Sequence, residues 1–180
     1  MKSWMAGSLG ALCLVACGAT GSMDGTVSGE SLAVADGLFS TKLAAGLEGG
    51  LIVLTDQSDA CLALESRALL KGYRGLVIIL MEMDGDSVVT PTAGEFNIIS
   101  GNGMPSDRFA SAAFVQRREA SCASEIDEKA SSGKITVTTY NAAKGVKGSY
   151  ELNFSNGDKV SGEFDVTLCE TTTTPENFCR

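Results

Sequence analysis

The side chains of this chain that could do chemistry are its carboxylates and its cysteines, because it contains no histidine. The usual Ser-His and Cys-His nucleophile pairs therefore cannot form, and the commonest metal ligand is absent. Two groups of carboxylates could act as an acid and base pair or as calcium ligands. They are Glu82, Asp84 and Asp86, and Glu119, Glu125, Asp127 and Glu128. Asp84-Gly85-Asp86 lacks the later glutamate of a calcium loop. We expect solvated turns at these acids, with no metal, no cofactor and no enzymatic activity.

The amino-terminal segment has the features of a bacterial secretion signal. Lys2 supplies a positive charge, and the apolar stretch that follows is too short to span a bilayer. Leu14-Val15-Ala16-Cys17-Gly18 resembles the lipobox of bacterial lipoproteins, in which the cysteine is lipidated and becomes the mature amino terminus. The resemblance implies lipidation at Cys17 and cleavage of residues 1–16. Gly18 stands where retained inner-membrane lipoproteins carry aspartate, which favours the outer membrane.

Four further cysteines lie in the exported part of the chain: Cys61, Cys122, Cys169 and Cys179. An even number of cysteines in an exported domain predicts two disulfides, for which three pairings are possible. The short separation of Cys169 and Cys179 favours a bond between them, and Cys61 would then pair with Cys122. No two cysteines have the CxxC spacing of a zinc site.

The charge balance bears on the partners. The chain has 14 basic and 22 acidic residues, a formal net charge of −8, and its basic residues are not clustered. This distribution argues against a nucleic-acid partner and against a polybasic membrane contact. The expected partners are the membrane, through the lipid on Cys17, and a protein of the cell envelope.

Residues 133–169 predict three consecutive antiparallel strands. Apolar residues alternate with polar ones, as in strands with one buried face. The first run places Ile135, Val137 and Thr139 on one face. Between the second and third runs, Asn156-Gly157 supplies the positive φ values of a tight hairpin turn.

Three predicted strands contain a glycine two residues before an aromatic residue. The pairs are Gly94 and Phe96, Gly148 and Tyr150, and Gly162 and Phe164. A glycine on the inner face leaves room for a neighbouring ring to lie across the backbone, or lets the strand bend. We interpret these pairs as core packing in preference to a ring stacked on a ligand.

The rest of the chain predicts further short strands and one helix. Strands are expected around 32–39, at 51–55, 73–83, 95–100 and 108–118, and a helical turn at 125–129. The helix is expected over 58–70, with Ser58 or Asp59 as its N-cap. We expect it to lie at one end or edge of the sheets, held there by Cys61.

The predicted fold is mainly β, with about eight strands, one short helix and disulfide bonds. Apolar runs around Ile52 and Ile78 fit strands buried on both faces, which favours an antiparallel β-sandwich over the alternative, a small β-barrel. The expected organisation is a signal peptide at 1–16, a flexible tether at 17–29, a single β domain at 30–170 and a tail at 171–180.

The mature chain resembles short outer-envelope lipoproteins common in myxobacteria. The shared features are Cys17, Cys61, Gly94-Glu95-Phe96, Cys122, Gly148-Ser149-Tyr150, Gly162-Glu163-Phe164 and Cys169. The resemblance implies a location in the cell envelope and a β-rich fold, and it brings no activity with it. Three functions remain open: a structural or protein-interaction module, a carrier or sensor of a small ligand, and an enzyme or enzyme inhibitor.

Overall fold

The computed structural model describes residues 20–43, 48–65, 72–99, 107–117 and 124–170. These residues form eleven strands and one helix. The strands are β1 (Thr20–Gly21), β2 (Asp24–Gly25), β3 (Asp36–Lys42), β4 (Glu48–Thr55), β5 (Arg74–Asp84), β6 (Ser87–Val89), β7 (Gly94–Ile98), β8 (Arg108–Arg117), β9 (Ser124–Asn141), β10 (Gly145–Phe154) and β11 (Lys159–Leu168). The helix is α1 (Ala60–Glu65).

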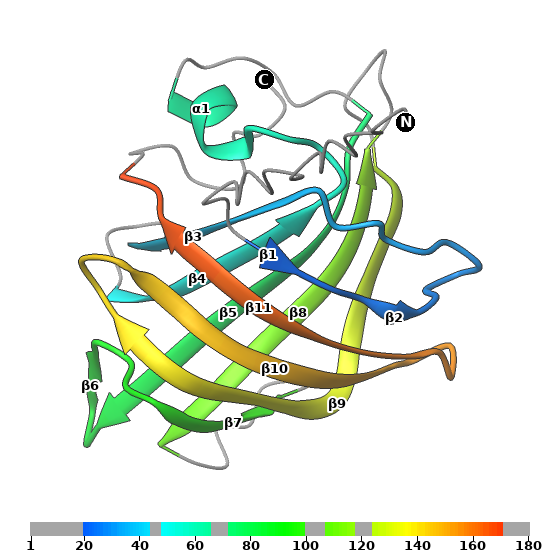
Figure 1. The fold of residues 1–180 in the computed structure, drawn as a ribbon. Coiled ribbons are helices and arrows are strands. Elements are labelled where there is room, and N and C mark those ends of the chain that lie inside the picture. Colours follow the sequence, from blue (N-terminus) through cyan, green and yellow to red (C-terminus); the bar gives the residue numbers. More distant parts are fainter. Residues whose placement is uncertain (1–19, 44–47, 66–71, 100–106, 118–123, 171–180) are drawn as a thin grey trace, which may run out of the picture.

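All eleven strands belong to one mixed sheet, in the order β1-β11-β10-β9-β7-β8-β5-β4-β3, with β2 paired to β11 and β6 to β5. Most pairs are antiparallel, but β7 lies parallel to β8. The sheet curls until β3 meets β11 through a short parallel pairing of Leu38 with Thr167 and Phe39 with Leu168 (Figure 1). The mainly antiparallel β class with one short helix and a disulfide is confirmed. The architecture is a single curled sheet. It is intermediate between the β-sandwich that the sequence favoured and the small β-barrel that it left as the alternative.

The predicted meander is present as β9, β10 and β11. β10 pairs antiparallel with both neighbours along its whole length, and Gly157, at φ 91°, lies in the turn that joins β10 to β11. One predicted position is wrong. The register shifts where Lys147 pairs with Thr139 and Gly148 with Val137, so Thr138 is an extra residue in β9. This bulge turns Thr139 outward and lets Tyr140 pack against the core.

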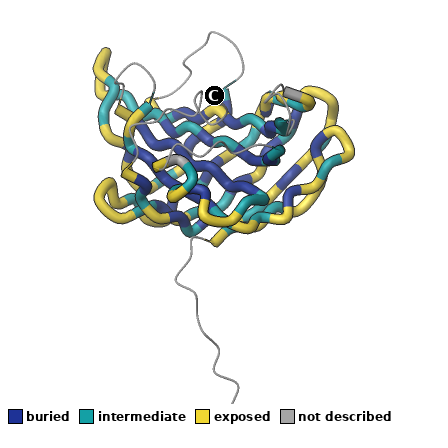
Figure 2. Tube along the Cα trace, turned by 90° about the horizontal axis from the view of Figure 1, so that it is seen from above, coloured by how far each residue is buried: buried dark blue, intermediate teal, exposed yellow. Residues whose placement is uncertain are grey.

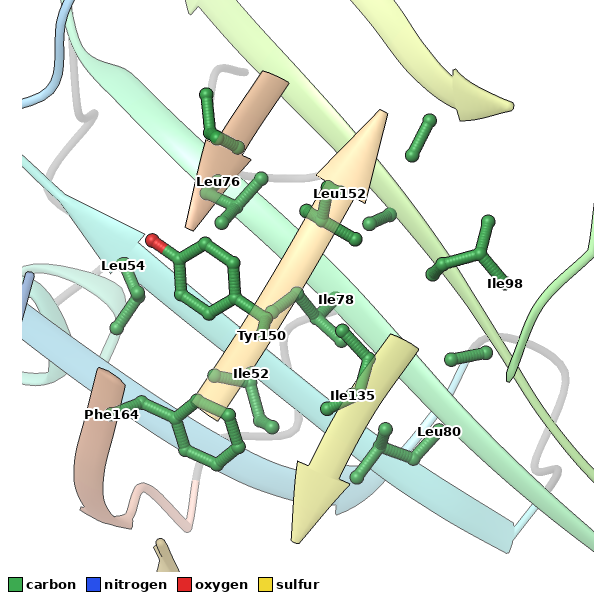
Figure 3. Close-up of a cluster of buried hydrophobic side chains, with 14 of the residues drawn as sticks. Ile52, Leu54, Leu76, Ile78, Leu80, Ile98, Ile135, Tyr150, Leu152 and Phe164 are labelled. Carbon is green, nitrogen blue, oxygen red and sulfur yellow. The ribbon is translucent and has the colours of Figure 1, made fainter. Parts of the chain in front are cut away.

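The concave side of the sheet encloses the main hydrophobic core. Figure 3 shows Tyr150 and Phe164 among aliphatic side chains of β4, β5 and β10 that point toward one another. The labelled aliphatic residues are Ile52, Leu54, Leu76, Ile78, Leu80, Ile98, Ile135 and Leu152, each at most 8% exposed. Along the strands the buried positions concentrate at their middles, and the turns are exposed (Figure 2). The described interior is therefore filled by side chains.

A second, smaller cluster lies on the outer face of β3, β4 and β5. It contains Leu51 and Val53, whose neighbours Ile52 and Leu54 point into the main core. This explains why the run around Ile52 is apolar at every position: β4 is buried on both faces, as expected. Ala60 of α1 joins the outer cluster, so the helix covers this end of the sheet.

Two expectations about local structure are wrong. The stretch 125–129 is the first part of β9, because its residues pair antiparallel with β8, Ala113 opposite Lys129 and Val115 opposite Asp127. Residues 20–29 are not a flexible tether. β1 and β2 pair with β11, and Val27 is fully buried. Short polar sequence led to the tether assignment, but backbone pairing with an edge strand needs no apolar side chains.

Candidate functional site

Of the four cysteines expected to form disulfides, the structure describes two, Cys61 and Cys169. Cys61 lies in α1 and Cys169 directly follows β11, and the two form a disulfide with Cα atoms 5.7 Å apart. The preferred pairing of Cys61 with Cys122 and of Cys169 with Cys179 is therefore wrong. Cys122 and Cys179 lie outside the described residues, as does the predicted lipidation site Cys17.

The pairing follows from the closure of the sheet, which separation along the sequence does not reveal. The backbone amide of Cys169 donates to the carbonyl of Phe39 over 2.8 Å, so the end of β11 lies against β3. The start of α1 is held at the same strand, because Asp36 Oδ2 accepts from the amide of Ala60 over 2.8 Å. Cys61 and Cys169 thus meet although they are 108 residues apart in sequence.

Among the described residues, one group of possible metal ligands lies within 4.8 Å of one another: Cys61, Glu65 and Cys169. Both sulfurs of this group belong to the disulfide. A disulfide offers no thiolate, which is the form of cysteine that binds a metal ion. Within this group, the Cys61–Cys169 disulfide links α1 covalently to the residue that follows β11.

The carboxylate of Glu82 forms part of a salt-bridge network at the end of β5. It accepts from Arg108 Nη2 over 3.0 Å and from the backbone amide of Thr92 over 2.8 Å. Partial burial raises the pKa of Glu82, but the hydrogen bonds from Arg108 and Thr92 lower it by more, so its pKa lies below the ordinary value. Asp84 and Asp86 lie at the exposed turn between β5 and β6. Glu82 thus holds the loop at Thr92 and the side chain of Arg108 at the end of β5.

Arg108 also explains the first glycine and aromatic pair. Its guanidinium lies 5.3 Å from the centroid of the Phe96 ring, and a Cβ atom on Gly94 would overlap its Nη1 atom. Gly94 therefore makes room for an arginine stacked on the neighbouring ring, and not for the ring itself. Sequence reasoning did not identify Arg108, because its partners come from three separate strands and loops.

The other two pairs pack as expected, with each glycine of one pair opposite the ring of the other. Gly148 lies directly across from Phe164, and Tyr150 lies directly across from Gly162. A Cβ atom on Gly148 would come within 2.7 Å of Phe164 Cζ, and one on Gly162 within 2.8 Å of Tyr150 Cζ. Each ring therefore covers a glycine backbone on the neighbouring strand, which confirms the core-packing interpretation.

An open polar hollow of about 490 Å³ lies on the outer face where β1 pairs with β11. The polar residues that line it include Thr20, Ser22, Lys147, Ser149, Glu163 and Asp165, and Gly148 and Phe164 also contribute to the lining. Lys147 Nζ and Asp165 Oδ2 form an ion pair over 2.5 Å, and both side chains are about half exposed. Hydroxyls and charges of both signs make this hollow suitable for a polar, zwitterionic group. We name it the polar hollow.

A second hollow, of about 370 Å³, lies on the outer face of β5 and β8, away from β11. Its lining is mostly apolar and includes Val77, Ile79, Ile99, Ser111, Ala113 and Lys129. Val77 and Ile79 are only partly buried, in contrast to Leu51 and Val53 on the neighbouring strand. We name it the apolar hollow. Its shape and chemistry suit an apolar side chain of another protein.

Comparison with known proteins finds no match: no family model, no curated protein and no solved structure is similar to this chain. Within the part of the chain that the structure describes, helices are too short or too polar to cross a membrane. Among the described residues, the polar hollow and the apolar hollow are taken as the candidate sites on their geometry and lining.

Proposed function

We propose that the protein is an exported lipoprotein, anchored in the outer membrane through Cys17, that acts as a structural or protein-interaction module of the cell envelope. The observation that carries this proposal is the filled interior of the sheet. Its inward side chains, from Ile52 on β4 to Phe164 on β11, are buried against one another. An interior of this kind directs function to the surface of the molecule.

The surface offers a contact site in the apolar hollow. Val77 and Ile79 are partly buried there, and Lys129, an exposed residue of β9, also lines the hollow. Apolar side chains beside a polar or charged one are common in protein contacts. The expected partner is an envelope protein that inserts apolar side chains over β5 and β8.

The same features favour an interaction module over the other two functions. A carrier needs an enclosed space, and the described core has side chains where the ligand would lie. An enzyme would need convergent reactive groups, whereas Glu82 is bound by Arg108 and Thr92. The chain also has no histidine to act as a general base.

The anchor is tested by expressing the full chain and the Cys17→Ser variant in a bacterial host with a lipoprotein pathway. On phase separation with detergent, the wild type should enter the detergent phase, and its amino-terminal peptide should carry the mass of acyl chains. The Cys17→Ser variant should stay in the aqueous phase. A wild type without acyl mass would contradict the anchor.

The contact site is tested by in-cell photo-crosslinking. A benzophenone amino acid at Ser111, in the apolar hollow, should give a discrete protein adduct, and one at Asp86, in the exposed β5–β6 turn, should not. Equal labelling at both positions, or adducts at neither, would contradict an interaction module at this surface. Native mass spectrometry of the same protein tests the carrier, which would retain a small molecule of a few hundred daltons, on the order of a drug-sized ligand.

A further inference from the structure

The fold begins very close to the predicted lipid anchor. Thr20 is the first residue of β1, three positions after Cys17. Three residues of fully extended chain span at most about 11 Å. If Cys17 carries the lipid, β1 therefore lies within about 11 Å of the bilayer surface, and no flexible tether separates the domain from the membrane.

The start of the fold is held firmly to the rest of the sheet. Thr20 pairs with Asp165, and the amide of Ser22 donates to the carbonyl of Glu163 over 3.0 Å. The Tyr150 hydroxyl donates to the Ser22 carbonyl over 2.7 Å, and Val27 a few residues later is fully buried. Releasing this segment to lengthen the link would break these hydrogen bonds and expose Val27. The short link is thus a property of the folded domain.

The start of β1 lies beside the closure of the sheet. Thr20 pairs with Asp165 of β11, and β3 pairs with the same strand two residues further on, at Thr167 and Leu168. Thr20 is exposed and lines the polar hollow together with Gly21, Ser22 and residues of β9, β10 and β11. The polar hollow is therefore the hollow at the start of the fold, three residues from Cys17 along the chain.

The chemistry of the polar hollow matches a phospholipid headgroup. One N–H of the Lys147 ammonium is donated to Asp165, and its remaining N–H groups, with the hydroxyls of Ser22 and Ser149, can donate to a phosphate. The exposed carboxylate of Glu163 can pair with a headgroup amine. Charges of both signs, within a protein of net charge −8, favour a zwitterionic headgroup over an anionic one. Phe164, the large apolar residue in the lining, is buried in the main core, so it is not presented to the hydrocarbon layer. The headgroup region is only about 5–8 Å thick on each side of a bilayer, so a face held within about 11 Å meets it.

We propose that the polar hollow beside β1 is a membrane-facing surface that takes zwitterionic phospholipid headgroups and fixes the orientation of the domain on the bilayer. This inference rests on the proposed lipid anchor at Cys17. It assigns opposite roles to the two hollows: the polar hollow faces the lipid, and the apolar hollow on β5 and β8 is left free for a protein partner.

The low tryptophan content of the chain allows a fluorescence test of this contact. The only tryptophan is Trp4, which lies in the segment expected to be cleaved. Ser149→Trp in the polar hollow and Ser111→Trp on β8 therefore each give a mature protein with a single tryptophan. The acylated variants are reconstituted in phosphatidylethanolamine and phosphatidylcholine vesicles that contain a phospholipid with a nitroxide on its headgroup. Quenching of the tryptophan fluorescence reports contact with the headgroup layer.

The expected result is quenching of the tryptophan of Ser149→Trp that is at least threefold stronger than that of Ser111→Trp. A spacer of twelve glycine and serine residues between Gly18 and Ala19, with a mean span of about 20 Å, should keep the acyl mass and remove this difference. Equal quenching of the two acylated variants without the spacer would overturn the headgroup contact and leave the anchor intact. An amino-terminal peptide without acyl mass would overturn the anchor, and with it the contact.

Discussion

The hydroxyl of Tyr150 donates a hydrogen bond of 2.7 Å to the backbone carbonyl of Ser22, a residue 128 positions earlier in the chain. Tyr150 is 2% exposed and lies in the main core, whereas Ser22 lies between β1 and β2 at the surface. Burial, and to a lesser extent the nearby carboxylate of Asp24, raise the pKa of Tyr150 well above its ordinary value, so the hydroxyl keeps its proton at all physiological pH values. The bond ties the start of the fold to the middle of the sheet.

Tyr150→Phe should loosen the start of the fold without disturbing the core. The ring stays in place over Gly162, and the loss of one hydrogen bond should lower the free energy of unfolding by about 1 kcal/mol. Amide exchange at Ser22 and Glu163 should accelerate, because the Ser22 amide donates to the Glu163 carbonyl and the Glu163 amide donates to the Ser22 hydroxyl, and both bonds lose this support. Tyr140→Phe is the matched control, since its hydroxyl donates to Gly49 over 3.3 Å, away from β1. Unchanged exchange at Ser22 in Tyr150→Phe would contradict the role of this bond.

Gly162→Ala should disturb the same junction by steric overlap. The new Cβ atom would lie 2.0 Å from the Ser22 carbonyl oxygen and 2.6 Å from the Tyr150 hydroxyl. The backbone of Ser22 must then shift, and we expect a loss of about 1–3 kcal/mol in urea unfolding. Ser161→Ala, at the exposed neighbouring position, should change stability by less than about 0.5 kcal/mol.

A double variant tests whether the two substitutions destabilise the protein through the same contact at Ser22. Gly162→Ala and Tyr150→Phe both act on the Ser22 contact. The double variant should therefore lose less free energy of unfolding than the sum of the losses of the two single variants. Full additivity would show that Gly162 acts through some other contact.

The sequence predicts those parts of the fold whose pairing is local. The meander of β9, β10 and β11 follows from alternation of apolar and polar residues, with short turns such as Asn156-Gly157 between the strands. The glycine and aromatic pairs are also visible, because Gly148 and Gly162 lie across from rings on adjacent strands.

The parts that depend on closure of the sheet could not be predicted in this way. The parallel pairing of β3 with β11 is only two residues long and leaves no pattern in the sequence. The contact of Asp36 with α1 and the pairing of Cys61 with Cys169 both depend on it. The polar hollow was missed for a related reason: β1 is too short and polar to be recognised as a strand.

The Cys61–Cys169 bond gives a direct chemical prediction. Digestion of the unreduced protein with trypsin and a glutamate-specific protease should yield a linked peptide that contains Cys61 and Cys169, because cleavage after Glu170 separates Cys169 from Cys179. If both expected disulfides form, the mature chain should be about 4 Da lighter than its reduced form, and Cys122 must then pair with Cys179. A linked peptide of Cys61 with Cys122 would contradict this connectivity.

Removal of this bond should have a large effect on stability because it closes a long loop. For a separation of 108 residues, the chain-entropy model gives about 4–5 kcal/mol, which is the loss expected for the double variant Cys61→Ser and Cys169→Ser. The double variant Cys122→Ser and Cys179→Ser is the control, and its Cys61–Cys169 peptide should be unchanged.

Glu82 predicts a specific dependence of stability on pH. The pKa of Glu82 lies below its ordinary value of 4.5 in the folded protein, chiefly because Arg108 and Thr92 donate to its carboxylate and outweigh the opposing effect of burial. Its contribution to stability is therefore fully present above about pH 4.5 and is lost as the pH falls through the lower, folded-state pKa. Glu82→Gln should lower the free energy of unfolding at pH 7 by about 1–3 kcal/mol, since it weakens a charged hydrogen bond.

The difference between Glu82→Gln and the wild type should shrink as the pH falls below 4.5, toward the lowered pKa of Glu82 in the folded protein. Asp86→Asn is the matched control, because Asp86 is an exposed residue of the neighbouring turn and should show a small difference at every pH. Urea unfolding at each pH measures both. A loss for Glu82→Gln that stays undiminished down to the acid unfolding of the wild type would mean that the glutamate stabilises the loop by shape alone, and that its charge, paired with Arg108, contributes nothing.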